Sequence, residues 1–139
     1  MPHKACVIVC GVVLAVLGAG CERPELPMSP TTPSDGIVLF EHANFLGNSA
    51  YITGDIPDLR EFKGPCVHGG GDDAAFDWND CVSSVRVAPG WRATIYKDTN
   101  YRDDSLEITA DAPNLQLVPG DCDHAGLNDC ISSVRVRRE

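Results

Sequence analysis

Short apolar runs separated by polar segments form the pattern of the chain from residue 36 onward. The runs are rich in β-branched and aromatic residues, and Gly, Asn, Asp and Pro lie between them, which is typical of strands and turns. Alternation of apolar and charged residues, as in residues 85–87, indicates strands with one face in water. We find no long helical pattern, although residues 74–78 have the composition for a single turn. Strands are therefore predicted at residues 37–40, 50–52, 82–87, 92–96, 106–108 and 131–136.

The second half of this region repeats the first. At an offset of 56 residues the aromatic positions coincide, with Phe40 on Tyr96 and Phe45 on Tyr101. The first copy then carries seven extra residues, 71–77, after which NDCVSSVRV at 79–87 aligns with NDCISSVRV at 128–136. A tandem duplication with about four strands per copy predicts an all-β sandwich of two Greek-key motifs, residues 36–88 and 90–138. One copy alone would expose its apolar face, so we expect the two to fold together.

The first 35 residues belong to a different class of sequence. Lys4 precedes an apolar run, residues 7–17, which is shorter than the about 20 residues that span a bilayer. Residues 1–20 therefore predict a secretory signal peptide. The small residues before Cys21 resemble the lipobox of bacterial lipoproteins, although the usual leucine lies one place further back; plain secretion with cleavage nearby is the alternative. Residues 21–35, with regularly spaced prolines, predict an extended tether behind a lipidated Cys21.

Charge narrows the classes of partner. The chain has 11 Lys and Arg against 20 Asp and Glu, a formal net charge of −9. Binding to nucleic acid requires a basic surface, so we expect no nucleic-acid partner. An acidic surface suits either a cation or simple solubility. The sequence also lacks a nucleophile elbow, a zinc-protease helix motif and a phosphate-binding glycine loop, so we expect no enzymatic activity.

Two features together resemble the βγ-crystallin family, in its microbial, calcium-binding type. They are the spacing Phe40-x-x-x-x-Phe45-x-Gly47 and the two Asn-Asp-x-x-Ser-Ser segments, and the resemblance covers residues 37–137. It implies a βγ-crystallin-like sandwich over residues 36–138. Asp103 stands where the family's hairpin glycine falls in the second motif, a position of positive φ that Asp tolerates at some cost.

The resemblance also implies about two calcium ions between the paired loops, with each ion taking ligands from both motifs. Calcium binds hard oxygen donors from carboxylates, carbonyls and hydroxyls. The alternative is that the loops are simple turns, which favour the same residue types. Ser84 and Ser133 are expected to connect strands and hairpins instead of binding metal. The implied ligands are the side chains of Asp80 and Asp129, the hydroxyls of Ser83 and Ser132, the carbonyls of Glu41 and Lys97, and the oxygen donors Asn79 and Asn128.

The cysteines of an exported domain are expected to form disulfides. Four cysteines allow three pairings, and locality favours one bridge in each motif. A zinc site that joins Cys66-x-His68 to Cys122-x-His124 is a weaker alternative, and the histidines are otherwise interpreted as solvated loop residues. The four cysteines of the domain are Cys66, Cys81, Cys122 and Cys130.

These features predict a calcium-binding, non-enzymatic structural or interaction domain of an exported envelope lipoprotein, anchored to a membrane through its lipid. The sequence identifies no protein partner. The alternative is a secreted metalloproteinase inhibitor, because some bacterial inhibitors of this kind resemble the same disulfide-stapled sandwich. In that case the extra residues 71–77 would present a loop to the peptidase. Trp78 and Trp91 are expected to pack in or beside the core.

Overall fold

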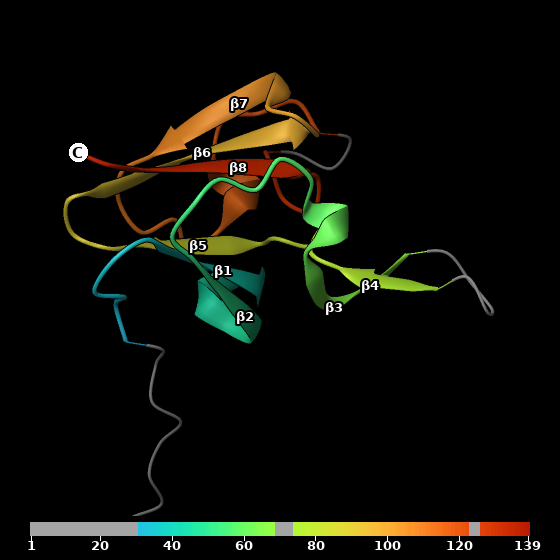
Figure 1. Ribbon diagram of the computed structural model, residues 1–139, viewed down its shortest axis with the longest axis horizontal. Helices are drawn as coiled ribbons and strands as arrows, with labels where there is room; N and C mark the ends of the chain where they lie inside the picture. The colour runs from blue at the N-terminus through green and yellow to red at the C-terminus, as the bar shows by residue number, and fades with distance from the viewer. Residues whose placement is uncertain (1–30, 69–73, 123–125) are drawn as a thin grey trace, which may run out of the picture.

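The computed structural model describes residues 31–68, 74–122 and 126–139. The predicted signal peptide, Cys21 and most of the predicted tether lie outside these residues. Two antiparallel three-stranded sheets stack face to face, as Figure 1 shows. Among the described residues, no helix has the length and apolar character needed to cross a bilayer.

The first sheet has the order β2-β1-β5 and the second the order β7-β6-β8, so each motif supplies one sheet. The strands confirm the all-β prediction; β1, β2, β6 and β7 are longer than predicted, whereas β5 and β8 begin two residues later than predicted. The first sheet contains β1 (Ile37–His42), β2 (Leu46–Ile52) and β5 (Ser84–Val87), and the second contains β6 (Trp91–Asp98), β7 (Arg102–Ile108) and β8 (Ser133–Arg138). Short 3-10 turns lie at η1 (Ala43–Phe45), η2 (Leu59–Glu61) and η4 (Leu115–Leu117).

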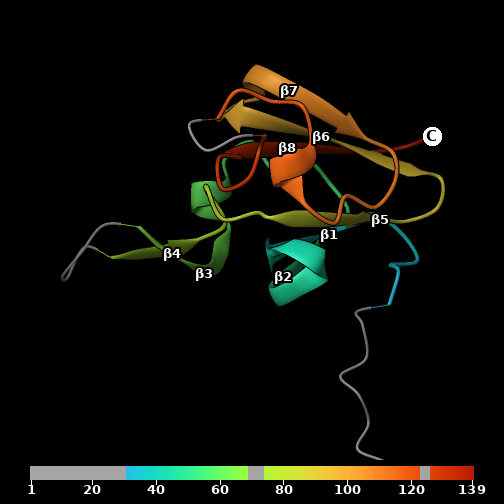
Figure 2. The same ribbon diagram turned by 180° about the vertical axis from the view of Figure 1, so that it is seen from behind.

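A third, two-stranded sheet consists of β3 (Lys63–His68) and β4 (Ala75–Asp77). Figures 1 and 2 both show it beside the stacked sheets, projecting from one end of the sandwich. The prediction of a single turn at residues 74–78 is wrong, and β3 was not predicted. Neither strand has the alternating apolar pattern of a core strand. Their apolar residues Val67 and Phe76 are exposed and face water.

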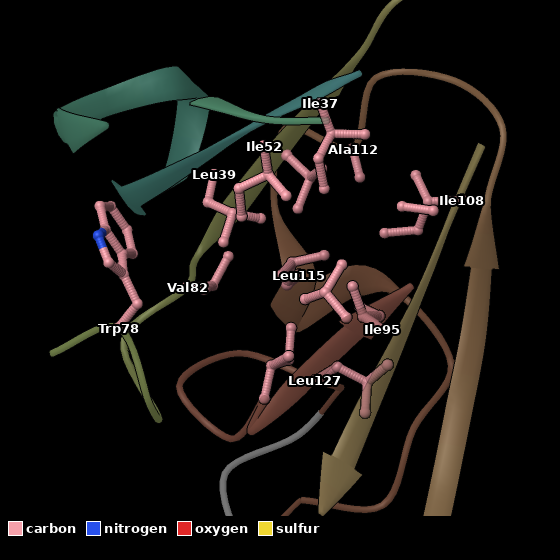
Figure 3. Packing of buried hydrophobic residues seen from close by; sticks show 14 of the residues in the cluster. Ile37, Leu39, Ile52, Trp78, Val82, Ile95, Ile108, Ala112, Leu115 and Leu127 are labelled. Atoms are coloured by element: carbon pink, nitrogen blue, oxygen red, sulfur yellow. The ribbon is translucent and has the colours of Figure 1, made fainter. Parts of the chain in front are cut away.

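The core lies between the two large sheets. Ile37 and Leu39 of β1 and Ile95 of β6 are fully buried, and Leu115 is buried among them. Figure 3 shows these side chains converging from both sheets, with Trp78 at one edge. Because the core is built from both motifs, the apolar face of each motif is covered by the other.

The motifs also exchange segments. Ile56 of the first motif exchanges backbone hydrogen bonds of 2.8 and 3.0 Å with Val134 in β8. Ala112 of the second motif exchanges bonds of 2.8 and 2.9 Å with Val85 in β5. Each sheet is thus extended by a segment of the other motif, so the two motifs form one cooperative unit.

The hairpins of the two motifs are alike. The rings of Phe40 and Phe45 pack edge to face at 5.6 Å, as do those of Tyr96 and Tyr101. The position of positive φ is filled by Gly47 (φ 77°) in the first hairpin and by Asp103 (φ 63°) in the second, as predicted. The second hairpin therefore forms the same turn despite lacking the glycine.

Two serine hydroxyls fasten these hairpins, as predicted. Ser84 Oγ accepts from Phe45 N at 3.0 Å and donates to the His42 carbonyl at 2.6 Å. Ser133 Oγ accepts from Tyr101 N at 3.0 Å and donates to the carbonyl of Asp98. Both hydroxyls are occupied within their own motif.

Disulfides join residues within each motif. Cys66 is bonded to Cys81, with Cα atoms 5.8 Å apart, and Cys122 to Cys130, with Cα atoms 6.3 Å apart. This is the local pairing among the three that the sequence allows. It also leaves no free thiolate among the four for a zinc site, because a disulfide sulfur is not the thiolate that zinc requires.

Candidate metal centre

The two Asn-Asp-x-x-Ser-Ser loops lie side by side and share backbone hydrogen bonds. Asp80 N donates to the Ile131 carbonyl at 3.1 Å, and Asp129 N donates to the Val82 carbonyl at 3.2 Å. Asp80 and Asp129 have φ values of 47° and 52°, in the left-handed region that non-glycine residues seldom adopt. Such outliers persist where surrounding contacts over-determine them, and they are frequent at binding sites.

One implied ligand pair is in contact across the motifs. Ser83 Oγ of the first loop donates to Asp129 Oδ1 of the second at 3.2 Å. For the reciprocal pair, Asp80 and Ser132, the described residues contain no direct side-chain hydrogen bond. The arrangement therefore brings a hydroxyl and a carboxylate together from different motifs at one of the two implied sites.

The backbone places the two implied carbonyl donors next to the loops. Ser83 N donates to the carbonyl of Phe40, and Ser132 N donates to the carbonyl of Tyr96, both at 2.9 Å. Glu41 and Lys97 directly follow these acceptors in the chain. Each implied carbonyl ligand thus belongs to the residue that follows the strand residue whose own carbonyl accepts from the loop serine.

The side chains of these two residues are directed to other partners. The Glu41 carboxylate accepts from the side-chain amide of Asn48 at 2.8 Å and from its backbone N–H, and these bonds lower the pKa of Glu41. Lys97 Nζ donates to the Asp121 carbonyl at 2.9 Å. Neither side chain is needed as a ligand, since the expectation concerns their carbonyl oxygens.

A groove of about 520 Å³ opens beside the loops, and four of the implied ligand residues line it. Asn79, Lys97, Asn128 and Ser132 do not line this groove, so the structure gathers half of the implied set around one cavity. The walls are formed by Glu41, His42, Pro65, Cys66, Val67, His68, Asp80, Cys81, Ser83 and Asp129.

The asparagines orient the carboxylates. Asn79 Nδ2 donates to Asp80 Oδ2 at 2.6 Å, and Asn128 Nδ2 likewise donates to Asp129 Oδ2. Asn79 Oδ1 is buried and has no hydrogen-bond partner among the described residues. A buried acceptor without a partner costs free energy, and a cation bound to this oxygen would remove that cost.

The electrostatics also fit a cation. Burial raises the pKa of Asp80, and the nearby carboxylates of Asp77 and Asp129 raise it further, while His68 and Asn79 act in the opposite sense. A divalent ion beside Asp80 and Asp129 would favour the ionised carboxylates. The donors present are carboxylate, hydroxyl, amide and carbonyl oxygens, which is the chemistry that calcium accepts.

The described residues hold no group of three or more His, Cys, Asp or Glu side chains placed to bind one metal ion. A site at these loops would therefore depend on carbonyl, hydroxyl and amide oxygens as well as on carboxylates. Asp80 and Asp129 are the carboxylates that the groove offers beside Glu41.

His68 and Asp77 are residues whose roles were not recognised in the sequence. His68 is expected to be a solvated loop residue, but it is the last residue of β3, and its Nε2 donates to the Asn79 carbonyl at 2.7 Å although the side chain is 36% exposed. Asp77 lies in the extra segment and is buried, with its Oδ1 accepting from Asn79 N at 2.9 Å. The Cys-x-His spacing was the only available signal. His124 lies outside the described residues.

Comparisons with known proteins agree with the architecture. A family model described as peptidase inhibitor family I36 matches residues 33–109, more than half of the chain. Spherulin-3A of Physarum polycephalum is 31% identical over 105 residues, which cover 75% of this chain and 84% of spherulin-3A.

Two solved structures share the fold. A domain from a study of the evolution of the eye-lens βγ-crystallin fold gives a TM-score of 0.60 at 28% identity, over 78% of this chain and 92% of that one. A βγ-crystallin domain from Flavobacterium johnsoniae gives a TM-score of 0.54 at 26% identity, over 76% and 97% of the respective chains. In both comparisons nearly the whole of the matched domain has a counterpart here.

Proposed function

The chain belongs to the βγ-crystallin family and to peptidase inhibitor family I36, and on this basis we propose that it is a calcium-binding, non-enzymatic structural or interaction domain. The observation that supports calcium most directly is the contact between Ser83 and Asp129. It joins a hydroxyl and a carboxylate of different motifs beside a groove that Asp80 also lines.

Two ions would bind between the loops. The proposed side-chain ligands are the carboxylates of Asp80 and Asp129 and the hydroxyls of Ser83 and Ser132. The Glu41 carbonyl is a proposed backbone ligand. The Lys97 carbonyl and the oxygens of Asn79 and Asn128 complete the proposed donor set. Bound calcium supplies positive charge that offsets the neighbouring carboxylates.

The function of such binding would be to stabilise the assembled sandwich. Asp80 and Asp129 lie on loops of different motifs that already share backbone hydrogen bonds. An ion that binds the folded loops and not the unfolded chain raises stability by mass action. Calcium would therefore make the domain more rigid and resistant in a calcium-rich compartment.

Calorimetric titration with calcium tests this proposal. The protein should bind about two ions, and Asp80→Ala and Asp129→Ala should each remove or weaken one of them. Asp104→Ala is the control, because it removes an exposed carboxylate of β7 that does not belong to the proposed donor set. No heat of binding and no thermal shift in millimolar calcium would refute the proposal.

Peptidase inhibition is the second candidate function, supported by the I36 match and by the β3–β4 sheet. Val67 and Phe76 are cross-strand partners in this sheet, and they are 55% and 60% exposed. An exposed apolar pair on a disulfide-linked projection is a suitable contact for another protein. Inhibition of a metallopeptidase panel, lost in Val67→Asp and retained in Asp80→Ala, would favour this function over calcium binding.

We further propose export to the cell envelope as a lipoprotein. This rests on the sequence alone, namely the apolar run at residues 7–17 followed by small residues and Cys21. Mass spectrometry of the mature protein tests it. An N-terminal diacylglyceryl cysteine is expected, and an unmodified N-terminus at another residue would contradict it.

A further inference from the structure

The β3–β4 sheet is connected to the first Asn-Asp-x-x-Ser-Ser loop, residues 79–84, at three points. The Cys66–Cys81 disulfide joins β3 to the residue that follows Asp80. The side chains of His68 at the end of β3 and of Asp77 at the end of β4 both bind Asn79, the residue that precedes Asp80. Asp80 thus lies between two anchored neighbours.

The contacts at Asn79 engage both of its backbone polar groups. Asn79 N donates to Asp77 Oδ1 at 2.9 Å, and the Asn79 carbonyl accepts from His68 Nε2 at 2.7 Å. His68 Nε2 also lies 3.3 Å from Asp77 Oδ1, so the two anchoring side chains support each other. Asp77 is only 2% exposed. The bond from Asn79 N to Asp77 is buried and the bond from His68 is part-buried, and together they hold this backbone segment in one conformation.

The second loop has no counterpart of Asp77, and His124, which aligns with His68, lies outside the described residues. Asp77 belongs to the extra residues 71–77, which the second motif does not have. Among the described residues, no side chain of another element donates to or accepts from the backbone of Asn128. The Cys122–Cys130 disulfide is the covalent anchor of this loop.

We propose that His68 and Asp77 are positioning residues that fix the first loop before calcium binds, so that the two calcium sites are non-equivalent. The site completed by Asp80 then binds the first ion, because less ordering of the loop accompanies binding. The inference rests on the proposed calcium function and adds to it an order of occupancy and the residues that set it.

Single-site backgrounds separate the two ions. Asp129→Asn leaves the site of Asp80, and Asp80→Asn leaves the site of Asp129. In each background, His68→Leu removes the donor to the Asn79 carbonyl, whereas His68→Gln keeps an N–H donor on a side chain of similar length. Calcium affinity is measured by calorimetry on the folded, oxidised protein.

His68→Leu should weaken the site of Asp80 by about fivefold, the effect of one part-buried hydrogen bond, and His68→Gln should restore most of the affinity. The site of Asp129 should change by less than about twofold. Equal weakening in both backgrounds, or no difference between Leu and Gln, overturns the inference while leaving calcium binding intact. If neither background binds calcium, the proposed function fails and the inference falls with it.

Amide hydrogen exchange gives a second measurement that needs no metal. In the calcium-free protein the Asn79 N–H should exchange slowly, and Asp77→Ala should accelerate it by about tenfold or more, because its acceptor is gone. Asp77→Asn keeps an oxygen acceptor and should preserve most of the protection. Rapid exchange of this amide in the unsubstituted protein would overturn the positioning role.

Discussion

Asp55 offers the sharpest test of how the two motifs are joined. Its Oδ1 accepts from Val136 N in β8 at 3.0 Å, and its Oδ2 accepts from the Arg137 guanidinium at 2.9 Å. Burial opposes ionisation of Asp55, but the hydrogen bonds from Arg137 and Val136 outweigh it and lower the pKa below the ordinary 3.8. The carboxylate therefore ties a loop of the first motif to the last strand of the second.

The expected magnitude follows from these contacts. The ion pair is partly solvated, with Asp55 29% and Arg137 53% exposed, so it contributes no more than about 1 kcal/mol. A hydrogen bond from a buried backbone N–H to a charged acceptor contributes about 1.5–3 kcal/mol. Asp55→Ala should therefore lower the free energy of unfolding by about 2–3 kcal/mol at neutral pH. Asp55→Asn retains an acceptor and should cost about 1 kcal/mol.

The sign of the pH dependence is also determined. Because the folded protein lowers the pKa of Asp55, the contribution is present above the ordinary value of 3.8 and is lost as the pH falls through the folded value. The difference in unfolding free energy between the unsubstituted protein and Asp55→Asn should therefore shrink as the pH is lowered from about 5 toward about 2.5.

Urea unfolding followed by tryptophan fluorescence, with EDTA present, measures these differences. Asp104→Asn is the matched control, since it removes one negative charge from an exposed position and should change stability by less than about 0.5 kcal/mol. A cost for Asp55→Asn that is the same at both ends of this pH range, or that Asp104→Asn reproduces, would refute the reasoning.

Three further predictions concern the loops, the disulfide and the core. Burial raises the pKa of Asp80, so its contribution to folding is present below 3.8 and is lost as the pH rises through the folded value. Asp80→Asn should then leave calcium-free stability at neutral pH unchanged or higher while reducing the calcium-induced rise in Tm, because only the site of Asp129 remains. A marked loss of calcium-free stability would contradict this. Replacing both Cys66 and Cys81 by Ser removes a bridge with a sequence separation of 15 and should lower the free energy of unfolding in urea by about 3 kcal/mol. An unchanged urea midpoint would show that the bridge is not formed in solution. Leu115→Ala at a fully buried position should cost about 2–4 kcal/mol, against less than about 0.5 kcal/mol for Leu117→Ala at 82% exposure; similar costs would place the core elsewhere.

The local features of the fold were predictable because each has a short-range physical cause. Strands follow from β-branched runs bounded by turn residues, and a positive φ at Asp103 follows from its alignment with Gly47. The roles of Ser84 and Ser133 were also predictable, since the duplication places both after the same loop. Repetition helped because a feature present at aligned positions in both copies points to a common structural cause.

The segment exchange between the motifs could not be predicted from the sequence in the same way. Ile56 and Val134 are joined by backbone hydrogen bonds, which any residue except proline can donate, so the side chains carry little signal of the pairing. The expectation that the motifs fold together came from the apolar faces and not from these bonds. Which strand receives which segment depends on how the two sheets stack.

The sequence by itself determined the duplication, the all-β class, the paired loops and the residue types that make them suitable for calcium. The family resemblance implied that Ser83 and Asp129 would meet across the motifs, and they are in contact. Only the tertiary structure decided that His68 and Asp77 bind Asn79. From the sequence, His68 is interpreted as solvated because the cysteines beside it are assigned to disulfides and not to a zinc site. Its partners, Asp77 at the end of β4 and Asn79 in the loop, lie 9 and 11 residues further along the chain, and the contacts form when β3 pairs with β4. This pairing has no alternating apolar pattern, so it could not be predicted from the sequence.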